Sequence, residues 1–232
     1  MEPISLIFLS VVGLLTLQLV LAAVQRSKRA GGRKASELHL NRRFQHALTG
    51  LAFFCLSYVL PPSTSSFLLI AASAALLAFN RLSLRSDSAM RAYQLLFGSL
   101  LRPHEREGNL PGAFYFLLGT AVCALAFEMD VARLSLLCLS IGDPFAAVVG
   151  TTIGGAKLYR GGGASFAGSG ACLIVSFGLG VWGMKLTPSE SAISATSATI
   201  AEALAPLIGV DDNLIMPVAT GSALSLFRFI KQ

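Results

Sequence analysis

The stretch "LSLLCLSIGDPFAAVVG", residues 134–150, has the composition of a membrane-spanning helix except for one carboxylate, Asp143. Pro144 cannot donate a hydrogen bond to the preceding turn and favours the first position of a helix. The pattern therefore predicts a broken helix, with a new N-terminus at Pro144. Non-helical backbone inside a membrane is tolerated only where it lines a cavity or is buried in protein. The alternative is a kink in which Asp143 merely caps its own helix.

The rest of the chain is also too apolar for a soluble protein. Of its 232 residues, 54% are hydrophobic and 13% are charged, and the mean hydropathy is +0.68. These values predict an all-α, polytopic integral membrane protein. About eight segments approach the length that a spanning helix needs: 3–24, 46–60, 62–80, 111–127, 131–150, 166–186, 189–209 and 214–230.

Basic residues predict the orientation of these spans, because lysine and arginine concentrate in cytoplasmic loops. Most of the 18 lysines and arginines fall in residues 25–45, 81–110 and 151–165, so these loops and the turn 209–213 are expected on the cytoplasmic side. We divide the chain into an N-terminal membrane anchor (1–24), a basic cytoplasmic linker (25–45) and a multi-spanning functional domain (46–232). An interfacial helix is expected around 88–101, where apolar residues recur every three or four positions.

Acidic residues gather on the same predicted face. The turn "GVDDNLIMP" contains Asp211, Asp212 and Asn213, whose oxygens are suited to Mg²⁺, although such a turn also commonly caps a helix. Glu202 lies within a predicted span, and an acid inside the membrane is a candidate functional residue. Together with Asp143, these residues form the predicted metal and catalytic set.

The cytoplasmic loops supply complementary positive charge. Arg42 and Arg43 lie at the mouth of the second span, and the glycine-rich loop "TIGGAKLYRGGGASFAGSG" contains Lys157 and Arg160. Glycines let backbone amides approach an anion closely, although the loop lacks the spacing of a P-loop. We expect His104 and Glu105 to lie in a solvated loop. The combination predicts a nucleoside triphosphate site beside lipid; the basic stretch after the first span is expected to orient that span rather than to bind nucleic acid.

Five motifs follow one another in an order that resembles a known family. They are "RRFQH", "REGNLPGAFYFLLG", "GDPFAAVVG", "SFAGSGA" and "EALAPLIGVDDNLIMPVATG". This order is similar to that of the CTP-dependent lipid-alcohol kinases, which include dolichol (polyprenol) kinase, phytol and farnesol kinase and the yeast-type diacylglycerol kinase, and which are related to the phosphatidate cytidylyltransferases. The resemblance implies transfer of the γ-phosphate of CTP to a membrane lipid alcohol, with Mg²⁺ or another divalent cation.

The resemblance also implies roles for individual residues. The family's required positions match Arg42, Arg43, Asp143 and Gly150, and Gly142 and Ser165 belong to the motifs expected to bind nucleotide. The chain departs from the family at Pro144, where a small or hydroxyl residue is usual. It departs again at Ala164, where a lysine is usual and where Lys157 or Arg160 is the expected replacement.

Two other functions remain open from the sequence. A phosphatidate cytidylyltransferase would also use CTP but would make CDP-diacylglycerol, and a membrane transporter would use the intramembrane acids to bind its substrate. An inactive relative of the kinases is a further alternative. The expected location is the endoplasmic reticulum, with the plastid envelope as the second choice, and the expected partners are a lipid alcohol and membrane lipids. The oligomeric state is left open.

Overall fold

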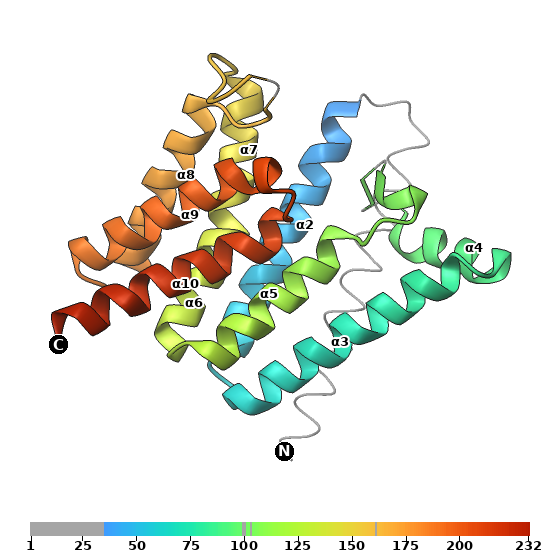
Figure 1. Ribbon diagram of the computed structural model, residues 1–232, viewed down its shortest axis with the longest axis horizontal. Helices are drawn as coiled ribbons and strands as arrows, with labels where there is room; N and C mark the ends of the chain where they lie inside the picture. The colour runs from blue at the N-terminus through green and yellow to red at the C-terminus, as the bar shows by residue number, and fades with distance from the viewer. Residues whose placement is uncertain (1–34, 99–100, 103, 161) are drawn as a thin grey trace.

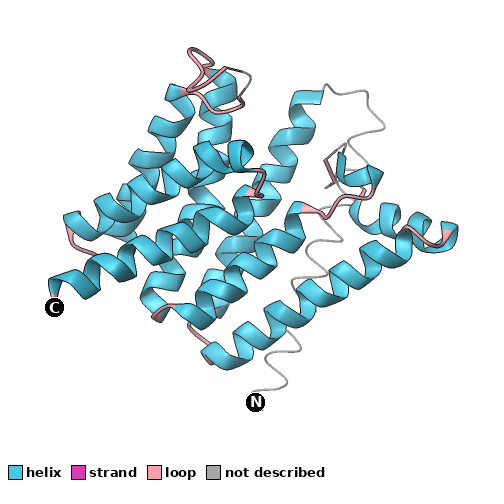
Figure 2. Cartoon of the chain, viewed as in Figure 1, coloured by secondary structure: helices cyan, strands magenta, loops and turns pink. Residues whose placement is uncertain are grey.

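The computed structural model describes residues 35–98, 101–102, 104–160 and 162–232. Throughout these ranges the chain consists of helices joined by loops and turns, without a strand (Figure 1, Figure 2). The all-α prediction is confirmed. In chain order, the elements are α2 (Ala35–Leu56), α3 (Pro62–Ser83), α4 (Asp87–Phe97), the 3-10 turn η1 (His104–Glu107), α5 (Gly112–Ala126), α6 (Met129–Leu137), the π-helical turn η2 (Cys138–Gly142), α7 (Asp143–Thr152), α8 (Phe166–Gly178), a second π-helical turn η3 (Leu179–Gly183), α9 (Pro188–Ile208) and α10 (Asp212–Lys231).

Several of these helices have the length and composition of membrane spans. Within the described residues, five segments qualify: Pro62–Ser83, Met129–Thr152, Phe166–Gly183, Pro188–Ile208 and Asp212–Lys231. Helix α5 is apolar but only 15 residues long. This supports a membrane protein, but it does not establish about eight spans.

The predicted anchor and linker at the N-terminus are only partly covered by the described residues. The predicted anchor 1–24 and the linker residues 25–34 lie outside the described residues. Residues 35–45, also predicted as linker, are helical and form the first half of α2. The predicted second span, 46–60, is therefore the continuation of a helix that begins earlier. The predicted interfacial helix around 88–101 corresponds to α4.

The helix around Asp143 is not broken, and the sequence prediction was wrong on this point. Helix α6 continues through η2 into α7, and Gly142 and Asp143 both have right-handed helical dihedral angles (φ −59°, ψ −50° and φ −62°, ψ −50°). In a regular α-helix, the Pro144 ring would clash with the carbonyl of Ser140, four residues earlier. The wider π-helical turn accommodates the proline without ending the helix. The capping alternative is also wrong, because the N-cap position of α7 is Gly142 and not Asp143.

Close packing surrounds this π-helical turn. Gly50 of α2 lies so near Ser140 that a Cβ atom at Gly50 would overlap the serine side chain. On another side of the turn, a Cβ atom on Gly142 would lie 2.7 Å from Ser176 Oγ of α8. Small residues of this kind let helices approach closely within a membrane. Helices α2 and α8 are therefore both fixed to the segment that carries Asp143.

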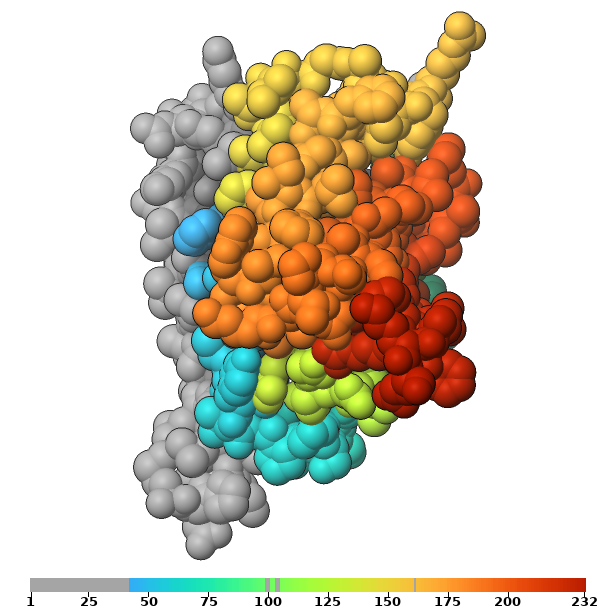
Figure 3. Space-filling model, turned by 90° about the vertical axis from the view of Figure 1, so that its left-hand side faces the viewer, coloured from blue at the N-terminus to red at the C-terminus, as the bar shows by residue number. Residues whose placement is uncertain are grey.

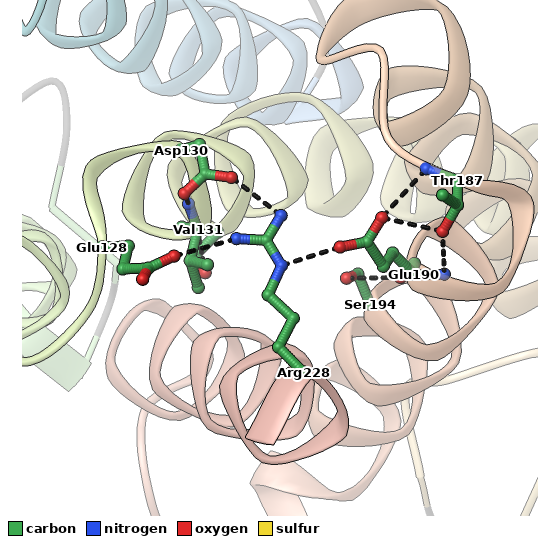
Figure 4. A network of polar contacts seen from close by, with 8 residues as sticks. Glu128, Asp130, Val131, Thr187, Glu190, Ser194 and Arg228 are labelled. Carbon is green, nitrogen blue, oxygen red and sulfur yellow. Dashed lines mark hydrogen bonds and ion pairs between the residues drawn. The ribbon is translucent and has the colours of Figure 1, made fainter. Parts of the chain in front are cut away.

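A cluster of ion pairs joins three helices at the other end of the bundle (Figure 4). Arg228 of α10 lies 2.7 Å from Glu190 Oε1, 2.8 Å from Asp130 Oδ2 and 3.1 Å from Glu128 Oε2. Glu190 also forms a capping box with Thr187 at the start of α9. Sixteen residues separate Asp212 from Arg228, or about 24 Å along the helix. The cluster therefore lies well away from the acidic turn that begins α10.

Candidate functional site

One cavity of about 1090 Å³ lies between α2, α3 and α5 and extends to α7, α8, α9 and α10. Its volume lies just above the usual range for small-molecule sites, about 300 to 1,000 Å³. Charged and polar side chains line one end, which we call the polar end: Arg42, Arg43, Gln45, Arg102, Glu105, Asp143, Lys157, Glu202, Asp212 and Asn213. The remaining part, which we call the apolar limb, is lined mainly by aliphatic and aromatic side chains.

The polar end is assembled from segments that are far apart in the sequence. Figure 1 shows the start of α2, the start of α5, the loop between α7 and α8 and the turn between α9 and α10 on the same side of the bundle. These segments contain the basic and acidic motifs that the predicted topology assigns to one face of the membrane. The helical arrangement thus brings the predicted groups together around one space.

Arg102 pairs with the acidic turn that precedes α10. Its Nη1 atom lies 3.5 Å from Asp211 Oδ2, and its Nη2 atom lies 3.5 Å from Asp212 Oδ1. Asp211 caps α10 by accepting a hydrogen bond from Asn213 N at 3.1 Å, and Asn213 Nδ2 donates to Asp211 Oδ1 at 2.6 Å. The capping interpretation of the turn is confirmed for Asp211. Asp212 and Asn213 line the cavity.

Glu105 is buried, with 4% of its surface exposed, so the expectation of a solvated side chain was wrong. Its carboxylate accepts hydrogen bonds from Arg102 N at 2.7 Å and from Gly112 N at 2.9 Å. Gly112 begins α5, and Pro111 before it offers no side-chain cap. Glu105 therefore satisfies a free N–H group at a helix start, where a negative charge is also favoured by the helix dipole. The side chain of His104 lies outside the described part of the structure.

The charges of the acidic turn influence one another. Burial and the neighbouring Asp212 carboxylate raise the pKa of Asp211 to about 6, against the opposing effect of Arg102. Burial by itself would lower the pKa of Arg102, but Asp212 and Asp211 outweigh it and raise that pKa. A further cation beside the turn would favour the ionised form of Asp211. The turn can therefore accept more positive charge than Arg102 supplies.

Helix α2 presents a row of polar side chains to the cavity. Arg42, Arg43 and His46 all line it, and His46 Nε2 lies 3.3 Å from the carbonyl oxygen of Leu139 in η2. Gln45 is only 6% exposed, and neither atom of its amide has a hydrogen-bond partner within the described part of the chain. A buried polar group without a partner is costly. The orientation of Gln45 toward the cavity therefore indicates a polar ligand at this end.

Asp143 and Glu202 bring two more carboxylates to the polar end. Asp143 interacts electrostatically with Asp212, Glu202 and Arg43. Glu202 Oε2 and Asn213 Oδ1 are buried and have no hydrogen-bond partner among the described residues. No group of three or more His, Cys, Asp or Glu side chains in that part of the chain has the arrangement of a complete metal site. Mg²⁺ commonly binds one or two carboxylates together with substrate phosphates, so these residues fit a cation that is shared with a nucleotide.

The glycine-rich loop between α7 and α8 borders the polar end. Lys157 and Ser165 face each other in an isolated bridge, and both line the cavity. Lys157 Nζ donates a hydrogen bond to Gly163 O at 2.8 Å, and Ser165 caps α8 through Gly168 N at 3.2 Å. A Cβ atom on Gly150 would lie 2.9 Å from Ser165 Oγ, so this glycine permits the close contact between α7 and α8.

The tip of the same loop lies farther out. Figure 3 shows the loop at the top of the molecule, above α8. Tyr159 attaches the loop to α9 by donating a hydrogen bond to Ala203 O at 3.0 Å. Of the two basic residues expected to replace a lysine at Ala164, Lys157 lines the cavity together with Ala164. Arg160 is exposed and does not line it.

Most of the predicted site residues meet at the cavity. Those that line it are Arg42, Arg43, Asp143, Gly150, Lys157, Ser165, Glu202, Asp212 and Asn213. Asp211 lies at the edge, Gly142 packs against α8, and Arg160 lies outside. Sequence reasoning missed Gln45, although its position three residues after Arg42 places both on one face of a helix. It also missed that Arg102 pairs with the acidic turn while Glu105 binds the backbone of Arg102 and Gly112. The charged composition of this loop does not indicate either contact.

Comparison with known proteins identifies plant relatives. A probable phytol kinase, chloroplastic, of Triticum aestivum is 29% identical over 205 residues, which cover 81% of this chain and 67% of the relative. A probable phytol kinase, chloroplastic, of Zea mays is 30% identical over 81% of this chain and 66% of the relative. Phytol kinase 1, chloroplastic, of Arabidopsis thaliana is 25% identical over 81% of this chain and 66% of the relative. A probable phytol kinase 1, chloroplastic, of Oryza sativa is also similar. The chain spans 64% to 67% of the length of these four relatives. No family model matches the chain, and no solved structure matches it significantly.

Proposed function

We propose that this chain is a lipid-alcohol kinase, as its similarity to phytol kinases indicates, and that it transfers the γ-phosphate of CTP to the hydroxyl of a membrane lipid alcohol. The observation that carries the proposal is a cavity in which a charged polar end continues into an apolar limb. A phosphoryl donor and a lipid acceptor need these two environments side by side. Phosphoryl transfer depends mainly on positioning and charge neutralisation, which such a site can supply.

Arginines are the first part of the proposed machinery. Arg42, Arg43 and Arg102 all line the polar end. Their planar guanidinium groups suit phosphate oxygens and would stabilise negative charge that develops during transfer. Arg102 is already held by Asp211 and Asp212, whereas Arg42 and Arg43 approach from another helix. The two sources would hold the triphosphate between α2 and the acidic turn.

Carboxylates are the second part. Asp143 and Asp212 would hold Mg²⁺, with the unpartnered Asn213 Oδ1 as a further oxygen ligand. The cation would neutralise charge on the phosphate oxygens. Glu202 lines the same end from α9 and has one buried carboxylate oxygen without a partner. We assign to Glu202 the orientation or deprotonation of the lipid hydroxyl.

The relatives also bear on the location of the protein. The compared phytol kinases are described as chloroplastic, which favours a plastid membrane over the endoplasmic reticulum expected from the sequence. We therefore propose a plastid envelope location. The phosphorylated end of the substrate would lie at the side of the membrane where the basic loops gather.

The test uses the full chain, purified in lipid micelles with Mg²⁺ and with CTP labelled at either the γ or the α position. Phytol, farnesol, dolichol, diacylglycerol and phosphatidate are supplied separately. Label from the γ position in an alcohol is expected. Label that enters lipid only from the α position, with phosphatidate, would show a cytidylyltransferase instead. ATP in place of CTP tests the donor, and equal or faster transfer from ATP would overturn the assignment of CTP.

A pair of variants tests the site itself. Asp143→Asn keeps the size of the side chain but removes its charge, so we expect turnover to fall by about 100-fold or more. Asp87→Asn removes an exposed carboxylate in α4, away from the cavity, and is the matched control. Full activity in Asp143→Asn would exclude this carboxylate from the proposed machinery.

A further inference from the structure

The apolar limb of the cavity is long. Along α2 the whole cavity, polar end included, extends from Arg42 to Ser57, a separation of fifteen residues or about 22 Å along a helix. It follows α3 from Phe79 back to Ser65, which is about 21 Å. The two helices therefore give nearly the same length for the space between them. Leucine and phenylalanine side chains such as Phe53, Leu56 and Leu68 line it.

The far end of the limb is formed by a fixed polar contact. Arg133 of α6 lines the cavity there, and its Nε atom donates a hydrogen bond to Ser57 Oγ at 2.9 Å. Its Nη2 atom donates to Ser57 O at 2.6 Å, and its guanidinium carbon lies 3.8 Å from the centre of the Tyr58 ring. These contacts hold Arg133 across the end of α2. Leu60 and Met129 line the cavity beside this contact, and we call the Arg133–Ser57 contact the floor of the limb.

We propose that the apolar limb is a channel for the hydrocarbon chain of the lipid alcohol and that the Arg133 floor sets the longest chain accepted. This inference rests on the proposed function, which places the hydroxyl at the polar end. Carbon–carbon bonds of about 1.5 Å advance an extended chain by about 1.25 Å each, so the ~21 Å along α3 accommodates a main chain of about seventeen carbons. An isoprenoid alcohol with a main chain of about sixteen carbons, such as phytol, fits this length.

The length of the channel has a consequence for specificity. A chain that ends before the floor leaves part of the limb without apolar contact and gains less from burial with each CH₂ group that it lacks. A chain longer than the limb meets the charged Arg133, where an apolar end loses its favourable environment. The preferred alcohol is therefore the one that fills the limb without reaching past Arg133.

A substitution halfway along α3 tests the channel. Ala72 lines the limb about 10 Å from the level of Phe79, and it is exposed, so a larger side chain can be accommodated. In Ala72→Phe we expect kcat/KM for phytol to fall at least tenfold, while that for geraniol, with about half the main chain, changes less than twofold. Ala74→Phe is the matched control, because Ala74 is an exposed alanine of the same helix that does not line the cavity.

A second variant tests the floor in the opposite direction. In Arg133→Ala we expect kcat/KM for a pentaprenyl alcohol, which is longer than the limb, to rise at least fivefold relative to kcat/KM for phytol. Binding of each alcohol to the purified full chain is measured beside turnover, by retention of radiolabelled alcohol, so that chain selection is read without catalysis. An unchanged ratio of long to short alcohols in both variants, by binding and by turnover, would overturn the channel. If the protein transfers no phosphate to any alcohol but still binds alcohols according to chain length, the proposed kinase activity is overturned and the channel is supported.

Discussion

Replacement of Glu105 by glutamine should destabilise the fold, because this side chain accepts two backbone hydrogen bonds at once. Its two carboxylate oxygens bind Arg102 N and Gly112 N. A glutamine has only one amide oxygen, so its NH₂ group would face one of the two N–H donors. A hydrogen bond to a charged group is worth about 1.5–3 kcal/mol, and an unsatisfied buried donor adds to the loss. We therefore expect a loss of about 2 kcal/mol or more.

Thermal unfolding in detergent measures this loss. For a chain of this size, about 2 kcal/mol corresponds to a decrease in Tm of about 4–8 °C. Glu107→Gln is the matched control, because Glu107 belongs to the same turn but is exposed. We expect its Tm to stay within about 1 °C of the unsubstituted protein, since most surface substitutions change stability little. Equal Tm values for the two variants would refute the role of Glu105 at the start of α5.

Three further predictions follow from other contacts. Gly50→Ala should lower Tm and expression, since the added Cβ atom would overlap the Ser140 side chain at η2; a folded variant with unchanged Tm would contradict this packing. Arg228→Ala should lower Tm by several degrees, because the charge of Glu190 then loses its partner in a partly buried cluster, and Arg228→Lys should restore part of the loss. The pKa of Asp211, raised to about 6, means that the folded state holds this proton more tightly than the unfolded chain. The free energy of unfolding should therefore fall as the pH rises from about 4 to about 6 and then level off. Measurements of Tm across this pH range should show a smaller fall for Asp211→Asn than for the unsubstituted protein.

Sequence patterns were sufficient for the helical class and for most residues of the polar end. Apolar segments and charged loops are local features, so the grouping of Arg42, Asp143 and Asp212 around one space followed from topology alone. The start of α2 was not predicted, because the basic composition of residues 25–45 resembles that of a linker. Its helix nevertheless begins at Ala35 and extends to Leu56.

Other features depend on contacts that no local pattern reveals. The carboxylate of Glu105 is buried only because the start of α5 lies opposite it. Pro144 led to the prediction of a break, which was wrong, because a π-helical turn relieves the same clash without ending the helix. Gly50 and Ser176 contact Ser140 and Gly142 of this turn from distant parts of the sequence, and no local pattern reveals these contacts.

The π-helical turn also lets α6 and α7 carry one additional residue. A π-helical turn contains one residue more than the α-helical turn that it replaces, so the helices on its two sides keep their relative orientation. Deletion of one residue within Cys138–Gly142 would preserve every charge in the chain and leave Asp143 directed to the same side. It would nevertheless restore a regular α-helical turn and bring the ring of Pro144 against the carbonyl group four residues earlier. The additional residue thus allows a proline directly after the buried carboxylate without ending the helix.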